Sequence, residues 1–339
     1  VPVAPDVLAA VLLTATNDRA KEYAAVTVGN CGANSSAAAE KLVQSENLMA
    51  ALASVIRQRQ SARLQETAAL ALKNCCSNGE PTAFTVARNQ ELLSTILDLA
   101  RNEDNLRLQS MGLGAINCLS RSYRAAPILR RSNVVEDVLW PFLAAAVDDR
   151  HELMVLTITC AIVNLSASQE DEQVFAQWAG SKAGMKCVGD LVHCLGLALN
   201  DGRWQNVSFS VHSVMYPLHN LLRTCPHADH VLLENNVVEH LDQLFRDAVH
   251  ATRDMETLEL GVKATRCLCR DAAAQVRMRK IDLVASLQRT FALLDPARGW
   301  RLQPEELIVA RRIVAEAKEI ISELFESVVT LWMGHHVRL

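Results

Sequence analysis

Hydrophobic positions recur along this chain with helical spacing around one short phrase. The phrase is an apolar stretch that ends in Asn followed by an apolar residue. Its copies are Thr27–Cys31, Ala71–Cys75, Gly114–Cys118, Ala161–Leu165 and Pro217–Leu221, and a sixth, Ala264–Leu268, carries Arg instead. The Asn column is Asn30, Asn74, Asn117, Asn164, Asn220 and Arg266, with steps of 44, 43, 47, 56 and 46 residues. Four of these five steps match the period of about 40–47 residues typical of helical repeat proteins.

The flanking columns predict an amphipathic helix at each copy. Positions six and two residues before the Asn, and one after it, are apolar in nearly every copy. Offsets of three and four residues share one helical face, so this face is expected to be buried. Positions seven before and four after the Asn are mostly polar and lie on the same face as the Asn itself. Each repeat helix is therefore expected to carry a second, wetter stripe that includes the Asn.

A further apolar segment precedes each Asn-bearing helix from the second copy on. These segments are 48–55, 92–99, 134–143, 188–197 and 237–245. The similar lead-ins Ser132–Glu136 and Asn235–Glu239 read as helix start signals, with Ser or Asn as the cap. Short polar breaks at Asp148–Arg150 and Asn200–Gly202 then separate the two helices.

These patterns predict one all-α domain over residues 1–339. The expected repeats are roughly 5–34, 35–78, 79–122, 123–169, 170–225 and 226–272, and helices over 281–333 are expected to cap the stack. The long step of 56 residues is explained by extra loop residues at Trp178–Gly184 and Asn200–Asn206. A second irregularity, Leu294–Trp300, interrupts the pattern near the end.

Composition favours closely packed helices. Half of the residues are apolar but only 4% are aromatic, so the core must consist mainly of Ala, Leu and Val. The formal charge of −4 gives no basic surplus, which disfavours nonspecific attraction to nucleic acid or anionic lipid. The apolar runs are shorter than the roughly 20 residues of a membrane span. We expect a cytoplasmic protein without a signal peptide, with nuclear, cytoskeletal or ciliary association left open. The chain could also be part of a longer protein.

The phrase, its period and the preceding apolar helix together resemble the armadillo repeat family, over roughly residues 17 to 275. The resemblance implies an α-solenoid, a right-handed superhelix of about six armadillo-like repeats with a C-terminal helical cap. The last helix of each repeat would line a concave groove. Family members use the Asn to hydrogen-bond the backbone of an extended partner peptide, and an amide offers both donors and an acceptor for this.

Carried onto this chain, the resemblance gives a set of candidate partner-binding residues. They are Asn30, Asn74, Asn117, Asn164, Asn220 and Arg266, with a secondary groove set of Asn78, Arg121, Lys263 and Arg270. Importin-alpha members also have Trp four residues before the Asn. This chain has Val26, Leu70, Leu113, Cys160, Tyr216 and Val262 there, so binding of nuclear signals is not expected.

Each candidate site also has a plainer interpretation. The Asn column could brace neighbouring helices without any partner. Lys263, Arg266 and Arg270 could form a basic pocket for an acidic or phosphorylated segment, or a solvated face paired with nearby acids. Cys31, Cys75, Cys118 and Cys267 recur with the repeat period in one column predicted to be buried, which favours packing over disulfides or metal. The cluster Cys225–His230 has metal-like spacing, but a polar turn is the commoner explanation.

The sequence thus predicts a non-catalytic scaffold or adaptor that binds an extended segment of a protein partner. The alternative is a regulator that clamps a folded partner, such as a chaperone cofactor or a small-GTPase regulator. Nucleic-acid binding is disfavoured because stacking aromatic residues are missing from the wetter stripe. Motifs of phosphate loops, nucleophile elbows and zinc proteases do not occur, so neither catalysis nor a cofactor is expected.

Overall fold

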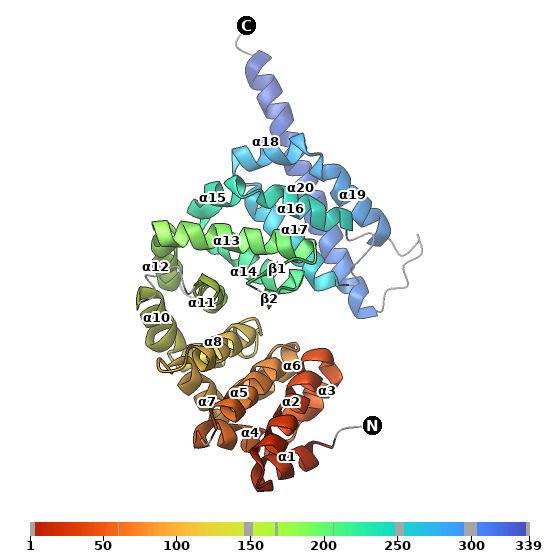
Figure 1. The fold of residues 1–339 in the computed structure, drawn as a ribbon. Coiled ribbons are helices and arrows are strands. Elements are labelled where there is room, and N and C mark those ends of the chain that lie inside the picture. Colours follow the sequence, from red (N-terminus) through yellow and green to blue (C-terminus); the bar gives the residue numbers. More distant parts are fainter. Residues whose placement is uncertain are drawn as a thin grey trace. The chain divides into compact units, whose positions relative to one another are not determined.

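The computed structural model describes residues 4–59, 61–145, 152–166, 169–205, 207–247, 254–294 and 304–336. The chain divides into two compact units, Val1–Ser166 (unit 1) and Ala167–Leu339 (unit 2), each of which is described by itself (Figure 1). The division lies close to the predicted boundary between the repeats 123–169 and 170–225. The predicted breaks at Asp148–Arg150 and, from residue 295 on, at Leu294–Trp300 lie outside the described residues.

Unit 1 is a stack of helices. Its elements are α1 (Pro5–Thr14), α2 (Asp18–Asn34), α3 (Ser36–Gln44), α4 (Glu46–Gln58), α5 (Ala62–Cys76), α6 (Glu80–Arg88), α7 (Gln90–Ala100), α8 (Leu106–Ser120), α9 (Ala126–Arg131), the π-helical turn η1 (Val135–Leu139), α10 (Trp140–Ala145) and α11 (Glu152–Leu165). The Asn-bearing helices α2, α5, α8 and α11 contact one another in that order, and α1, α4 and α7 form a second row (Figure 1).

Unit 2 has the same plan with one insertion. Its elements are α12 (Gln169–Ala179), α13 (Lys182–Leu199), β1 (Arg203–Trp204), β2 (Val207–Ser208), α14 (Val211–Thr224), the 3₁₀ turn η3 (Pro226–Ala228), α15 (Asp229–Glu234), α16 (Val237–Asp247), α17 (Met255–Leu268), α18 (Ala272–Lys280), α19 (Leu283–Leu294) and α20 (Pro304–His336). Helices α14, α17 and α20 form one row, and α13, α16 and α19 form another.

Most Asn-bearing helices start at a polar residue whose side chain caps the helix. The side chains of Asn17, Ser61, Asn105, Ser210 and Asp254 accept hydrogen bonds from backbone N–H groups in the first turns of α2, α5, α8, α14 and α17. Such a cap satisfies a donor that the helix leaves without a partner, which fixes where the helix begins. The first three caps are 44 residues apart, so the capping residues recur with the same period as the apolar positions.

Helical elements begin at the two lead-ins predicted as start signals, η1 at Val135 and α16 at Val237, but the Asn residues there do not act as side-chain caps. Asn133 and Asn236 adopt left-handed backbone conformations, with φ of 49° and 65°, in the turns after α9 and α15. The side chain of neither caps the helix that follows. Asp282, between α18 and α19, has the same conformation with φ of 59°. Asn and Asp tolerate this region better than other side chains, so these residues make the tight turn between the first two helices of a repeat.

The extra residues of the long step are only partly loop. The first predicted loop, Trp178–Gly184, is a two-residue break between α12 and α13, where Cβ on Gly184 would lie 2.2 Å from the Trp178 carbonyl oxygen. The second is a two-stranded antiparallel hairpin in which Trp204 pairs with Val207. Trp204 also makes an edge contact with His193, with 6.4 Å between ring centroids. This hairpin is the one departure from helical secondary structure within the described ranges.

The core lies between the rows of helices and consists of small and aliphatic side chains, as the composition predicts. The column two residues before the Asn is buried in every copy: Val28, Leu72, Ala115, Ile162, Leu218 and Ala264. The column one after the Asn is not uniformly buried. Cys75 is buried, whereas Cys31, Cys118 and Cys267 are half-buried because this position lies at the edge of the buried stripe. Within the described residues, no helix combines the length and apolar character needed to cross a membrane.

Candidate protein-binding face

The first three Asn-bearing helices of unit 1 present a continuous row of side chains. We call this the Asn face and define it as Tyr23, Val26, Asn30, Leu70, Lys73, Asn74, Asn78, Asn117 and Arg121. Offsets of four residues place Val26 with Asn30, Leu70 with Asn74, and Asn117 with Arg121 on one side of their helices. The face is assembled by the contacts of α2 with α5 and of α5 with α8.

Glycines bring α2 and α5 into close contact. Cβ on Gly29 would lie 3.3 Å from Cα of Ala71, and Cβ on Gly32 would lie 3.1 Å from Sγ of Cys75. The Asn74 side chain then donates a hydrogen bond to the Gly29 carbonyl oxygen over 3.2 Å, and the Asn78 side chain donates to the Gly32 carbonyl. The amides of Asn74 and Asn78 therefore brace neighbouring repeats.

Asn164 has a similar bracing role at the other end of unit 1. Its Nδ2 donates to Oγ of Ser120 over 3.1 Å, and that hydroxyl donates to the Asn117 carbonyl oxygen over 2.8 Å. Asn164 is buried, with an exposed fraction of 8%. The amide links α11 to the end of α8 and lies beneath the surface rather than on the Asn face.

Asn30 and Asn117 are arranged differently. Asn30 is exposed, and in the described part of the chain its side chain makes no hydrogen bond to another residue. Asn117 is half-buried, and its Oδ1 is buried without a hydrogen-bond donor nearby in that same part. The next residue along this stripe, Arg121, likewise has a buried Nε with no acceptor. The Asn column thus contains amides that brace helices and amides that do not.

Exposed apolar side chains accompany these amides on α2 and α5. Tyr23, Val26 and Leu70 have exposed fractions of 60%, 43% and 41%. In the same column as Val26 and Leu70, the side chains of Leu113, Cys160 and Val262 are buried. The apolar part of the Asn face is therefore confined to its first two helices.

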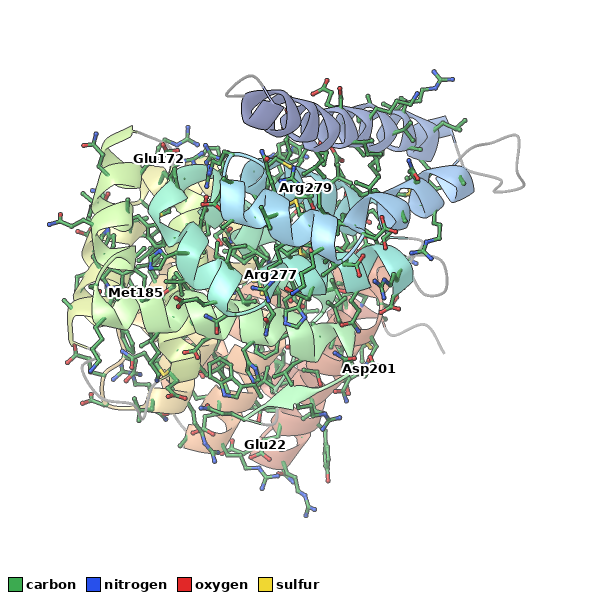
Figure 2. The ribbon with its side chains drawn as sticks, turned by 90° about the horizontal axis from the view of Figure 1, so that it is seen from above. Glu22, Glu172, Met185, Asp201, Arg277 and Arg279 are labelled. Atoms are coloured by element: carbon green, nitrogen blue, oxygen red, sulfur yellow. The ribbon has the colours of Figure 1, made fainter. Side chains whose placement is uncertain are left out.

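In unit 2 the candidate basic residues pair with separate acids. Lys263 contacts Glu259 on its own helix at 2.8 Å, and Arg266 contacts Glu319 of α20 at 2.5 Å. Arg270 forms a two-pronged pair with Asp229 at 3.0 and 2.9 Å and donates to the Leu222 carbonyl oxygen. Arg223 pairs with Glu172 of α12, labelled in Figure 2, at 3.1 Å. The three predicted groove cations are therefore held by acids from three different helices.

Asn220 and its neighbours on α14 continue the column into unit 2. Asn220 is half-buried, and its backbone carbonyl accepts a hydrogen bond from the Thr224 hydroxyl over 3.0 Å. Burial and, to a smaller extent, the positive charges of Lys263 and Arg223 together lower the pKa of the adjacent His219 to about 4. His219 is therefore neutral at physiological pH.

Helices α18, α19 and α20, which are predicted to cap the stack, form a seventh copy of the repeat. Arg312 pairs with Glu259 at 3.3 Å and Glu319 with Arg266, so both acid–base pairs join positions 53 residues apart. The buried residues Ile313, Ala317 and Ile320 occupy the apolar columns six and two before Glu319 and one after it. That apolar spacing was the available signal. It was missed because Glu replaces Asn and the step is long.

The remaining polar clusters have structural partners. In the Cys225–His230 segment, the carboxylate of Asp229 accepts hydrogen bonds from Arg270, and Cys225 is buried. Across the residues that the structure describes, no group of three or more His, Cys, Asp or Glu side chains is placed to hold a metal ion. All ten cysteines are free thiols, and burial raises the pKa of Cys75 to about 12. Such a thiol carries little thiolate at neutral pH and is a poor nucleophile.

Comparison with known proteins identifies the fold. No protein-family model and no curated protein matches the sequence. A solved structure described as "A conserved phosphorylation switch controls the interaction between cadherin and beta-catenin in vitro and in vivo" matches 94% of this chain and 61% of its own, with a TM-score of 0.57 and 16% identity. A designed armadillo repeat protein matches 78% of this chain and 99% of its own, with a TM-score of 0.48 and 16% identity.

The chain therefore has an armadillo-like fold, an all-α solenoid of three-helix repeats. This confirms the fold class predicted from the Asn column and its period. At 16% identity, the likeness concerns the fold and not the partner.

Proposed function

We propose that this chain is a non-catalytic protein-binding scaffold whose Asn face holds an extended segment of a partner protein. The observation that carries the proposal is the pairing of unbraced amides, Asn30 and Asn117, with the exposed apolar side chains Val26 and Leu70 on adjacent repeat helices. Bracing alone accounts for Asn74 and Asn164, but it leaves Asn30 and Asn117 without a role. The fold-level similarity to a structure that concerns two interacting proteins agrees with such a function.

The spacing of the face suits an extended chain. Packed helices lie about 8–10 Å apart, and an extended segment advances about 3.3 Å per residue, so each helix meets roughly every third residue. A bound segment loses water from its peptide groups, which cost free energy unless they gain hydrogen-bond partners. Unbraced amides can supply both a donor and an acceptor to such a group. Exposed Val26 and Leu70 would shield the apolar side chains of the segment from water.

The test is affinity capture by the full chain followed by cross-linking and mass spectrometry of the captured complex. We expect cross-links from α2, α5 and α8 to one linear segment of the partner. The double variant Asn30→Ala with Asn117→Ala should capture at least about tenfold less partner, the effect of about 1.4 kcal/mol of lost binding free energy. Its circular dichroism and unfolding midpoint should match the parent chain.

Two other outcomes would count against the proposal. Cross-links to several distant surfaces of a folded partner would favour a clamp-like regulator instead. Capture that is unaffected by the double variant, with cross-links away from the Asn face, would remove this face as the binding site. The matched control is Asn102→Ala, which changes the same residue type in the turn between α7 and α8.

A further inference from the structure

We call the contact between the adjacent repeat helices α5 and α8 the α5–α8 step. Its side-chain hydrogen bonds differ from those between the other neighbouring repeat helices of unit 1. Near the amino ends of the two helices, Glu66 accepts from the Asn105 side chain over 3.4 Å and pairs with Arg107 at 3.3 Å. In their carboxyl halves, 68–78 and 111–121, no side-chain hydrogen bond crosses from one helix to the other within the described chain. The neighbouring steps are bridged there by Asn74 and by Asn164. The carboxyl half of the α5–α8 step is therefore the part of the Asn face where the described polar side chains form no hydrogen bonds between the helices.

A lysine lies across this step. Gly114 of α8 has no side chain, and a Cβ placed there would lie 3.0 Å from Cε and 3.4 Å from Cδ of Lys73. The aliphatic part of Lys73 thus packs over Gly114, one helical turn before Asn117. Lys73 makes no ion pair with another described residue. Its ammonium group is carried from α5 toward the stripe that holds Asn117 and Arg121.

Within the repeat helices, the charges around this step are all of one sign, and an acid just beyond their carboxyl ends, Glu80, accepts a hydrogen bond from the backbone N–H of Arg124 over 3.2 Å. The matching windows of the four repeat helices, 24–34, 68–78, 111–121 and 158–168, contain two charged residues, Lys73 and Arg121, and both are basic. The nearest acids on the same helices, Glu22 and Glu66, lie about two turns away and pair with Arg63 and Arg107. Unit 2 shows the contrast, because there Lys263, Arg266 and Arg270 each pair with a carboxylate.

Two atoms of this stripe are already desolvated without compensation. Oδ1 of Asn117 and Nε of Arg121 are buried and unpaired, in side chains that are otherwise half-buried. A buried polar group without a partner costs free energy in the unbound protein. A ligand that supplies a donor to Asn117 and an acceptor to Arg121, after a rotation about their terminal side-chain bonds, removes that cost. An extended acidic peptide provides both, through a backbone N–H and a carboxylate.

We propose that the α5–α8 step binds an Asp or Glu side chain of an extended partner segment, with Lys73 and Arg121 around the carboxylate and Asn117 on the adjoining backbone. This rests on the proposed function and names the chemistry of the partner. The exposed Leu70 and Val26 lie on α5 and α2, one and two helices away. The preferred segment therefore has apolar residues about three and six positions from the acidic one.

The presence of Arg121 at this position also has a purely structural explanation. It is the C-cap of α8, where a positive charge is favourable next to the helix dipole. A purely structural arginine would affect stability but would not select the charge of a ligand. The chain supplies a matched control in Arg101, the C-cap of α7, which has a similar backbone conformation and lines a cleft formed by the loops before α5 and α8.

The experiment is selection of a random 12-residue peptide library on the full chain, followed by affinity measurement of synthetic versions of the enriched peptides. We expect enriched peptides to share an Asp or Glu next to apolar residues. Replacing that Glu by Gln, or Arg121 by Gln, should weaken binding about tenfold or more, as for loss of a charge-assisted hydrogen bond. Arg121→Glu should bind a peptide with Lys at the acidic position better than the parent chain does. Arg101→Gln should bind like the parent.

The results separate this inference from the function on which it rests. Peptides that lose affinity with Leu70→Ser but show no preference for an acid would overturn the acidic site and leave the extended-segment scaffold standing. Enriched peptides that bind equally to the Leu70→Ser and Arg121→Gln variants, or no enrichment at all, would overturn both. Affinity for an acidic peptide that is unchanged between low and high salt would also contradict pairing at a half-exposed site.

Discussion

At the residue scale, one column of identical amides has two physical roles. Asn74 and Asn164 use their donors on a neighbouring helix, whereas Asn117 has a buried oxygen that no donor reaches. The column and its period could be read from the sequence because the residue type repeats. The division of roles could not, because it depends on whether the facing helix offers a carbonyl at close range, as Gly29 does.

This division predicts that truncating Asn74 and Asn117 to Ala changes the free energy of unfolding by different amounts. Asn74→Ala should lower the free energy of unfolding by about 1–2 kcal/mol, because it removes a hydrogen bond and leaves the Gly29 carbonyl oxygen with one partner fewer. Asn117→Ala should be close to neutral, because it removes an oxygen that already lacks a donor. Urea unfolding followed by circular dichroism measures both. Equal losses for the two variants would contradict the assignment.

His219 predicts a pH dependence of stability. Its pKa in the folded protein is about 4, below its ordinary value of 6.5, so the unfolded chain binds more protons between these values. Stability should therefore fall as the pH is lowered from 6.5 toward 4. His219→Gln should flatten this part of the profile of unfolding midpoint against pH. A profile that His219→Gln leaves unchanged would show that other groups cause the acid sensitivity.

At the element scale, the repeat is defined by its caps and turns as much as by its apolar stripe. The stripe could be predicted because helical periodicity acts within one helix. The left-handed turns at Asn133 and Asn236 were mistaken for caps, since the same residue types serve both purposes. The seventh copy was hidden because the Arg266–Glu319 pair replaces two amides, and complementary charges become visible only when the helices lie side by side.

Close approach between elements makes one glycine critical. Cβ on Gly112 would lie 2.3 Å from the backbone nitrogen of Ala100, so α8 can pack on the end of α7 only without a side chain there. Gly112→Ala should lower the free energy of unfolding by about 1–3 kcal/mol or more, as overpacking does. Gly180→Ala is the matched control, because its Cβ would meet neighbours only at 3.6 Å and should change stability by less than about 0.5 kcal/mol. Thermal unfolding compares the two, and similar losses would argue against backbone overlap as the cause.

At the scale of the whole molecule, the chain consists of two compact units whose corresponding surfaces have different chemistry. The Asn face of unit 1 is apolar and basic, whereas the third helices of unit 2 carry a network of paired charges. Composition gave no sign of this difference, because a net charge of −4 averages over the chain. Only the placement of acids on α20 and α15 shows which cations remain unpaired.

The location of the Asn face predicts that binding belongs to unit 1. A fragment of residues 1–166 should be helical, should unfold cooperatively, and should bind the selected acidic peptides within about threefold of the full chain, because each unit has its own buried core. The fragment 167–339 should not bind them. Circular dichroism and fluorescence polarisation measure these properties. Binding by the second fragment alone would place the site elsewhere.

The uneven joining of α5 and α8 also has a mechanical consequence. Glu66 fastens their amino ends, while their carboxyl ends lack the side-chain bridge that joins α2 to α5 and α8 to α11. Bending of unit 1 should therefore concentrate at this joint, as a hinge motion that changes the distance between the carboxyl ends of α5 and α8. A peptide bound at Asn117 would contact both helices and hold their carboxyl ends together. Peptide binding would then reduce the bending of unit 1 as a whole, beyond the residues that contact the peptide.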